Sequence, residues 1–126
     1  MAQAKRRGFT LVEVLTVIAI IALLAAMLLG LAGLAQKSAA KKKAQSEISQ
    51  LEGFVTAYQA QNGKVPQIPA ELTAALHKAN HPLAGQVDPW RNPHEYQASS
   101  RATFYLWSTA GSAVLNPATA IGTPPP

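Results

Sequence analysis

The chain has 126 residues, a formal net charge of +5 at pH 7 and no cysteine. This length allows one small domain and leaves no room for a large enzyme core. The lack of cysteine excludes disulfides, CxxC redox centres and cysteine-ligated zinc sites. The positive charge is weak evidence for nucleic-acid binding, because loss of the first eight residues by processing would remove Lys5, Arg6 and Arg7 and lower the formal charge to about +2.

The first predicted element is a membrane-spanning helix. The 21 residues 14–34 carry no charge, and only one threonine and two glycines interrupt their apolar character. At about 1.5 Å per residue, roughly 20 such residues cross the ~30 Å hydrocarbon core of a bilayer. Glu13 lies just inside this apolar segment, and an ionised carboxylate there costs on the order of a few kcal/mol unless it is paired. The partner must come from the start of the chain or from another molecule, because the span contains none.

Two other interpretations of the apolar run stay open. A secretory signal peptide has an apolar core of about 7–15 residues without an internal carboxylate, so this run is too long, although the alanine-rich stretch near residues 34–35 could mimic a cleavage site. A plain single-pass anchor would leave Glu13 without a role. The basic residues 5–7 favour a cytoplasmic amino end, whereas four lysines at positions 37 and 41–43 follow the span and oppose it.

The junction before the span carries a motif that reads Arg7-Gly8-Phe9-Thr10-Leu11-Val12-Glu13. It resembles the leader and helix start of type IV prepilins and pseudopilins. The resemblance implies that a prepilin peptidase removes residues 1–8 by cutting after Gly8 and methylates the new amino terminus at Phe9. It also implies that Glu13 pairs with the Phe9 amine of a neighbouring subunit. Such a head-to-tail contact builds open helical filaments; the alternative is a carboxylate that snorkels to the membrane interface.

The helix is expected to continue beyond the membrane. An apolar stripe with alternating spacings of four and three extends along it, while Glu47 falls off this stripe. The stripe consists of Ala44, Ile48, Leu51, Val55 and Tyr58. Asn62-Gly63 is a typical helix stop. We therefore expect one helix over residues 9–61, with residues 9–35 in the membrane and an amphipathic continuation over residues 36–62.

Residues 63–115 are expected to form a small globular domain against this stripe. A short helix is predicted over residues 70–78, with Leu72, Ala75 and Leu76 on its buried face. Two strands are predicted over residues 94–98 and 103–108. Residues 116–126, which end in three prolines, are expected to be a flexible tail. The predicted fold class is α+β and pilin-like: a long N-terminal helix packed on a domain with a short helix and a β-hairpin.

The second half of the chain carries a further resemblance. The stretch Asp88-Pro89-Trp90-Arg91-Asn92-Pro93-His94-Glu95-Tyr96 is similar to the Asp-Pro-Trp-Gly-x-Pro-Tyr-x-Tyr stretch of G-type major pseudopilins of type II secretion, and residues 104–108 are similar to the strand that follows it.

That family usually continues with an acidic loop that binds calcium, whereas residues 108–113 contain no carboxylate. Because calcium prefers several oxygen ligands that include carboxylates, no metal is predicted. The loop is expected to be held by packing of Trp107 and Val114 and by local hydrogen bonds.

Other candidate sites are weak. His77 and His81 have the four-residue spacing of helical metal ligands but lack a third ligand. His94 with Ser108 or Ser112 carries no nucleophile motif. The aromatic residues at positions 90, 96, 105 and 107 could stack on single-stranded nucleic acid, but too few cations surround them. No cofactor, enzymatic activity or specific nucleic-acid partner is predicted.

These observations predict a structural subunit of a type II secretion pseudopilus or a type IV pilus-like filament. The alternative is a membrane-anchored minor pilin or adhesin that does not form the main fibre. The expected partners are copies of the chain and related subunits, the prepilin peptidase, the inner-membrane assembly machinery and membrane lipid. The expected location is the inner membrane, with a single span, a cytoplasmic amino end and the C-terminal domain on the periplasmic side.

Overall fold

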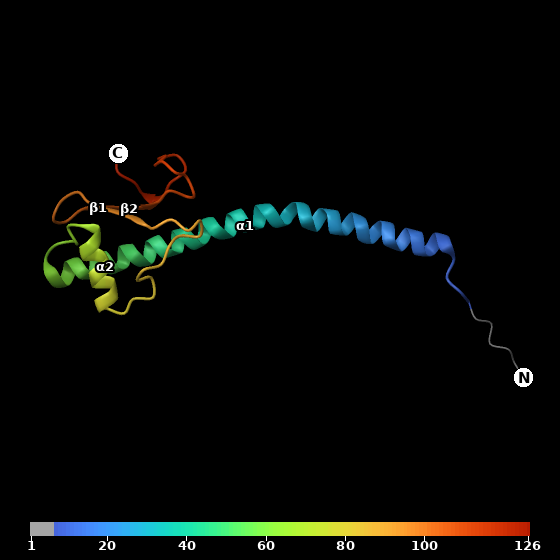
Figure 1. Cartoon of the computed structure of the whole chain (residues 1–126), viewed down its shortest axis with the longest axis horizontal. Helices are drawn as coiled ribbons and strands as arrows, with labels where there is room; N and C mark the ends of the chain where they lie inside the picture. The colour runs from blue at the N-terminus through green and yellow to red at the C-terminus, as the bar shows by residue number, and fades with distance from the viewer. Residues whose placement is uncertain (1–6) are drawn as a thin grey trace, which may run out of the picture. The chain divides into compact units, whose positions relative to one another are not determined.

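The computed structural model describes residues 7–126 (Figure 1). Residues 1–6 of the expected leader lie outside the described residues. The elements follow the order α1, α2, β1, β2 and β3, and the chain divides into two compact units, Met1–Lys37 and Ser38–Pro126. The predicted α+β architecture of long helix, short helix and antiparallel strands is confirmed.

Helix α1 spans Leu11–Asn62 and begins two residues later than predicted. Thr10 explains this start, because its carbonyl accepts the Val14 N–H (3.2 Å) and its hydroxyl accepts the Glu13 N–H (3.2 Å), which caps the helix. The helix ends as expected at Gly63, which has a φ of 72° and donates its N–H to the Gln59 carbonyl (2.8 Å).

The part of α1 in the first unit is exposed, whereas the part in the second unit has a buried face. All side chains of residues 11–34 are exposed, and this part of α1 is long and apolar enough to cross a membrane. In the second unit the predicted stripe is buried at Ala44, Ile48, Leu51 and Val55, while Tyr58 is half-buried. Glu47, which was expected off the stripe, is also buried.

Helix α2 spans Pro69–Lys78, in agreement with the predicted short helix. Proline at the first helical position has no N–H to leave unpaired, and its fixed φ suits a helix start. Leu72 and Leu76 are buried as predicted, whereas Ala75 is half-buried. These two leucines join the stripe of α1 and the sheet in one hydrophobic core.

The sheet has three antiparallel strands in the order β1-β2-β3. Strand β1 spans Glu95–Ala98 and β2 spans Phe104–Ser108, each starting one residue later than predicted. In the β1–β2 pair, Tyr96 lies opposite Leu106, and both side chains are buried in the core.

The prediction of a flexible tail over residues 116–126 is wrong, because β3 spans Ile121–Thr123 within it. Ile121 is only 5% exposed and pairs with Ser108 of β2. Gly122 has a φ of 103°, and a Cβ at this position would lie 2.4 Å from the Leu106 carbonyl oxygen. Only glycine allows so close an approach of the two strands.

Candidate functional site

The start of α1 brings together the residues that the sequence singles out. Thr10 donates its backbone N–H to the Glu13 carboxylate (2.8 Å) and accepts the Glu13 N–H with its hydroxyl (3.2 Å). This reciprocal pair is a capping box, which satisfies two N–H groups at the helix start. The Thr-x-x-Glu spacing was visible in the sequence, but the prediction considered only the charge of Glu13. The carboxylate therefore has a structural role within its own chain.

Gly8 and Phe9 precede this cap in an exposed segment. Phe9 is 87% exposed, and a side chain added at Gly8 would meet no atom within 4 Å. Among the described residues, none forms an ion pair with Glu13. Within residues 7–126, the peptide bond between Gly8 and Phe9 is therefore exposed, and the exposed Glu13 carboxylate accepts the Thr10 N–H but has no cation within ion-pair distance.

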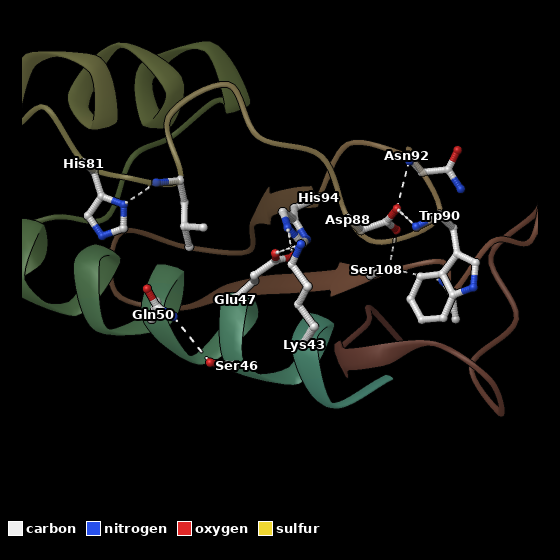
Figure 2. Close-up of polar contacts among 12 residues, drawn as sticks. Lys43, Ser46, Glu47, Gln50, His81, Asp88, Trp90, Asn92, His94 and Ser108 are labelled. Carbon is white, nitrogen blue, oxygen red and sulfur yellow. Dashed lines mark hydrogen bonds and ion pairs between the residues drawn. The ribbon is translucent and has the colours of Figure 1, made fainter. Parts of the chain in front are cut away.

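A second polar centre lies in the connector between α2 and the sheet (Figure 2). The Asp88 carboxylate, in a residue only 2% exposed, accepts the backbone N–H groups of Trp90 (3.0 Å) and Asn92 (2.8 Å) through Oδ1. Its Oδ2 accepts the hydroxyl of Ser108 at the end of β2 (2.5 Å). The connector is therefore tied to the sheet by a buried, charge-assisted hydrogen bond.

The packing predicted for the following loop is only partly right. Trp107 is buried as expected, but Val114 is 76% exposed and cannot hold the loop. The ring of Trp90 lies there instead, and a Cβ on Gly111 would come within 2.9 Å of its Cδ1. Trp107 could be predicted to pack here from its place in a strand. The contact of Trp90 with Gly111 could not be predicted, because it depends on how the connector folds.

Sequence reasoning missed a buried pair between α1 and the residue before β1. The Oε2 atom of Glu47 lies 3.2 Å from Nε2 of His94, and both side chains are 6% exposed. Lys43, on the preceding turn of α1, places its ammonium group 3.8 Å from Oε1 of the same carboxylate (Figure 2). Glu47 lies three residues after Ala44, so both side chains are on the same, buried face of α1, and this spacing could have predicted the burial of Glu47.

Polar contacts also join the end of α1 to α2. The Glu71 carboxylate accepts the Gln67 N–H (2.7 Å) and the Tyr58 hydroxyl (2.9 Å). The bond from Gln67, followed by that from Tyr58, holds the pKa of Glu71 below its usual value. Nearby, Tyr96 donates its hydroxyl to the Pro66 carbonyl (2.6 Å). Burial, with a smaller contribution from the Glu71 charge, raises the pKa of Tyr96 to about 12.

The weaker candidates are not assembled into sites. The His81 ring accepts the Leu83 N–H through Nδ1 (3.2 Å) and meets Phe54 edge to face. Within residues 7–126, no group of three or more histidine and acidic side chains lies close enough to hold a metal ion. Ser108 donates to Asp88 and not to His94. The aromatic residues offer no continuous platform, because Trp107 and Tyr96 are buried.

Comparison with protein families gives two matches. Residues 3–29 match the prokaryotic N-terminal methylation motif, and residues 33–113 match type II secretion system protein G. No curated protein and no solved structure matches the chain in the same comparisons. The second match covers more than half of the chain and includes the end of the helix, the connector and strands β1 and β2. The chain therefore belongs to the protein G family of the type II secretion system and is a non-enzymatic major pseudopilin, a subunit of the pseudopilus.

Proposed function

We propose that the subunit is made as a precursor with a leader of residues 1–8, cut after Gly8 by prepilin peptidase and methylated at Phe9. The N-terminal methylation motif covers this junction. The exposed backbone around Gly8 and Phe9 supports the proposal, because a peptidase must reach both sides of the bond it cuts. The mature chain then begins four residues before Glu13.

The observation that carries the assembly step is the position of Glu13 at the start of an exposed, apolar helix. Its side chain is exposed, and it is the only acidic residue before Glu47. A carboxylate in lipid needs a cation, and cleavage creates one at the Phe9 amine. Pairing Glu13 with the amine of a neighbouring subunit removes two unpaired charges from lipid together and adds subunits head to tail.

The apolar helix anchors the subunit in the membrane, and we propose the side of the membrane on which each end of the chain lies. The amino end faces the cytoplasm, where the peptidase and assembly machinery act on it, and the unit from Ser38 onward lies on the periplasmic side. We give the basic residues 5–7 more weight than the later lysines, because the charge before the first span usually dominates orientation. The partners are further copies of the chain and related pseudopilins.

Intact-mass measurement of the protein extracted from membranes tests the processing step. The expected mass corresponds to residues 9–126 with one added methyl group. A mass that retains residues 1–8, or a start near Gln36, would contradict it. Gly8→Leu should block the cut, and because space around Gly8 is open, this block would reflect peptidase recognition and not misfolding.

Two substitutions separate the charge of Glu13 from its capping role. Glu13→Gln keeps an oxygen that can accept the Thr10 N–H but removes the charge, whereas Glu13→Leu removes both. Both variants should insert and be processed, and fibre yield in a reconstituted secretion strain should fall sharply for both. Normal fibre yield from Glu13→Gln would contradict charge pairing, and a defect confined to Glu13→Leu would assign the effect to the cap.

A further inference from the structure

The connector at Asp88 and the loop after β2 are joined by a chain of hydrogen bonds (Figure 2). Asp88 accepts two backbone N–H groups through Oδ1 and the Ser108 hydroxyl through Oδ2. Ser108 is fully buried, and its Oγ accepts in turn the N–H of Ala110 (3.1 Å). The carboxylate on one side of the junction is thus linked through one hydroxyl to the backbone of the loop on the other side.

The same junction is closed by a side-chain contact. Ala110 and Gly111 both have positive φ values, 52° and 85°, and this turn brings the loop against the ring of Trp90. Trp90 is one of the residues whose N–H binds Asp88. The hydrogen bonds and the packing therefore fix the same two segments, the connector and the first residues of the loop.

The resemblance to G-type pseudopilins implied calcium at this loop, and the residues present do not fit that ion. Calcium takes about 6–8 oxygen ligands. Both oxygens of Asp88 already accept hydrogen bonds, and Oδ1 of Asn116 accepts the Ala118 N–H (3.0 Å). Glu95 is exposed on β1, and residues 109–115 carry no carboxylate. Thr109 and Ser112 would supply only neutral oxygens, which compensate poorly for the dehydration of a divalent cation.

We infer that a hydrogen-bonded clamp of Asp88 and Ser108 holds this loop in place without calcium. A carboxylate that accepts several hydrogen bonds is well stabilised without a metal, and Ser108 links this carboxylate to the backbone of the loop. The stability of the second unit is then independent of divalent cations.

The test uses the full chain in detergent micelles and follows unfolding by tryptophan fluorescence. Both tryptophans, Trp90 and Trp107, lie in the second unit, so the signal excludes the apolar helix, and Trp90 reports directly on the loop. The melting temperature should be the same in excess EDTA and in millimolar calcium. A calcium-dependent rise of several degrees would overturn the inference.

Substitutions of the clamp distinguish it from a metal site. Ser108→Ala leaves Asp88 Oδ2 buried without its donor, so the melting temperature should fall by about 5 °C or more, equally in EDTA and in calcium. Ser112→Ala, in the same loop, is the control and should leave it unchanged. An unchanged melting temperature for Ser108→Ala would overturn the clamp.

Asp88→Asn distinguishes a hydrogen-bonded clamp from a calcium site even if Ser108→Ala fails to fold. The amide oxygen can accept the same two N–H groups and the amide nitrogen can donate to Ser108 Oγ, but the buried Ser108 hydroxyl then loses its acceptor and the charge assistance is lost. Asp88→Asn should therefore unfold at a temperature between those of the wild type and Asp88→Ala, which loses all three hydrogen bonds. A calcium response of the wild type that Asp88→Asn abolishes would show that the carboxylate binds the ion.

Discussion

Leu51→Ala should destabilise the second unit by about 3 kcal/mol. Leu51 is 3% exposed and packs in the core formed by α1, α2 and the sheet. Removing three buried carbon groups costs about 0.8 kcal/mol each in transfer free energy, and the remaining void adds to this within the usual range of ~2–5 kcal/mol. Leu51 also lines a pocket of about 200 Å³ that opens to solvent, and truncation of its side chain would enlarge this pocket.

Tryptophan-monitored unfolding of the full chain in detergent measures this loss. For a unit of this size, about 3 kcal/mol corresponds to a fall in melting temperature of roughly 12–24 °C. Val114→Ala is the control, because this side chain is exposed, and it should change stability by less than about 0.5 kcal/mol. A loss below about 0.5 kcal/mol for Leu51→Ala would show that Leu51 does not stabilise the core and would assign the stripe of α1 to contacts between subunits.

Three further variants test contacts that the structure adds. Ile121→Ala should lower the melting temperature through loss of core packing, by about 2–4 kcal/mol, and an unaffected melting temperature would contradict a docked β3. Glu71→Gln should lower the melting temperature at neutral pH. Its difference in melting temperature from the wild type should shrink as the pH falls through the lowered pKa of Glu71, where the wild-type carboxylate becomes protonated. A difference that stays constant with pH would contradict this. Glu47→Leu should destabilise the unit by about 1–3 kcal/mol, because it removes the polar atom that lies 3.2 Å from Nε2 of the buried His94 ring, and adding His94→Leu should recover part of the loss in a double-mutant cycle.

The elements with clear periodicity could be predicted from the sequence. The spacing of Ile48, Leu51 and Val55 indicated the buried face of α1, and the alternation after Thr103 indicated β2. Element ends shifted by one or two residues because they depend on local hydrogen bonds. Thr10, for example, caps α1 with its own hydroxyl, so the helix begins at Leu11 and not at Phe9.

Strand β3 could not be predicted because it is too short to show a pattern. It has one large apolar residue, Ile121, followed by Gly122, and both flanking segments are rich in proline and alanine. Its conformation depends on the edge of β2, which offers N–H and C=O groups for pairing. The pairing of Glu47 could not be predicted either. A carboxylate is rarely buried unless it is paired, and the residue beside it, His94, lies 47 residues further along the chain.

The apolar half of α1 alone gives little drive toward assembly. Its side chains are exposed along residues 11–34, and in a bilayer they are already removed from water, so exchanging lipid for like helices adds little hydrophobic free energy. Glu13 is the one acidic group of this region, and its charge costs on the order of a few kcal/mol in lipid until it is paired. Removing that charge should therefore ease residence in the membrane and weaken assembly at the same time. Easier residence in the membrane together with weaker assembly would show that the charge of Glu13 raises the free energy of the single subunit in lipid relative to the subunit in the fibre.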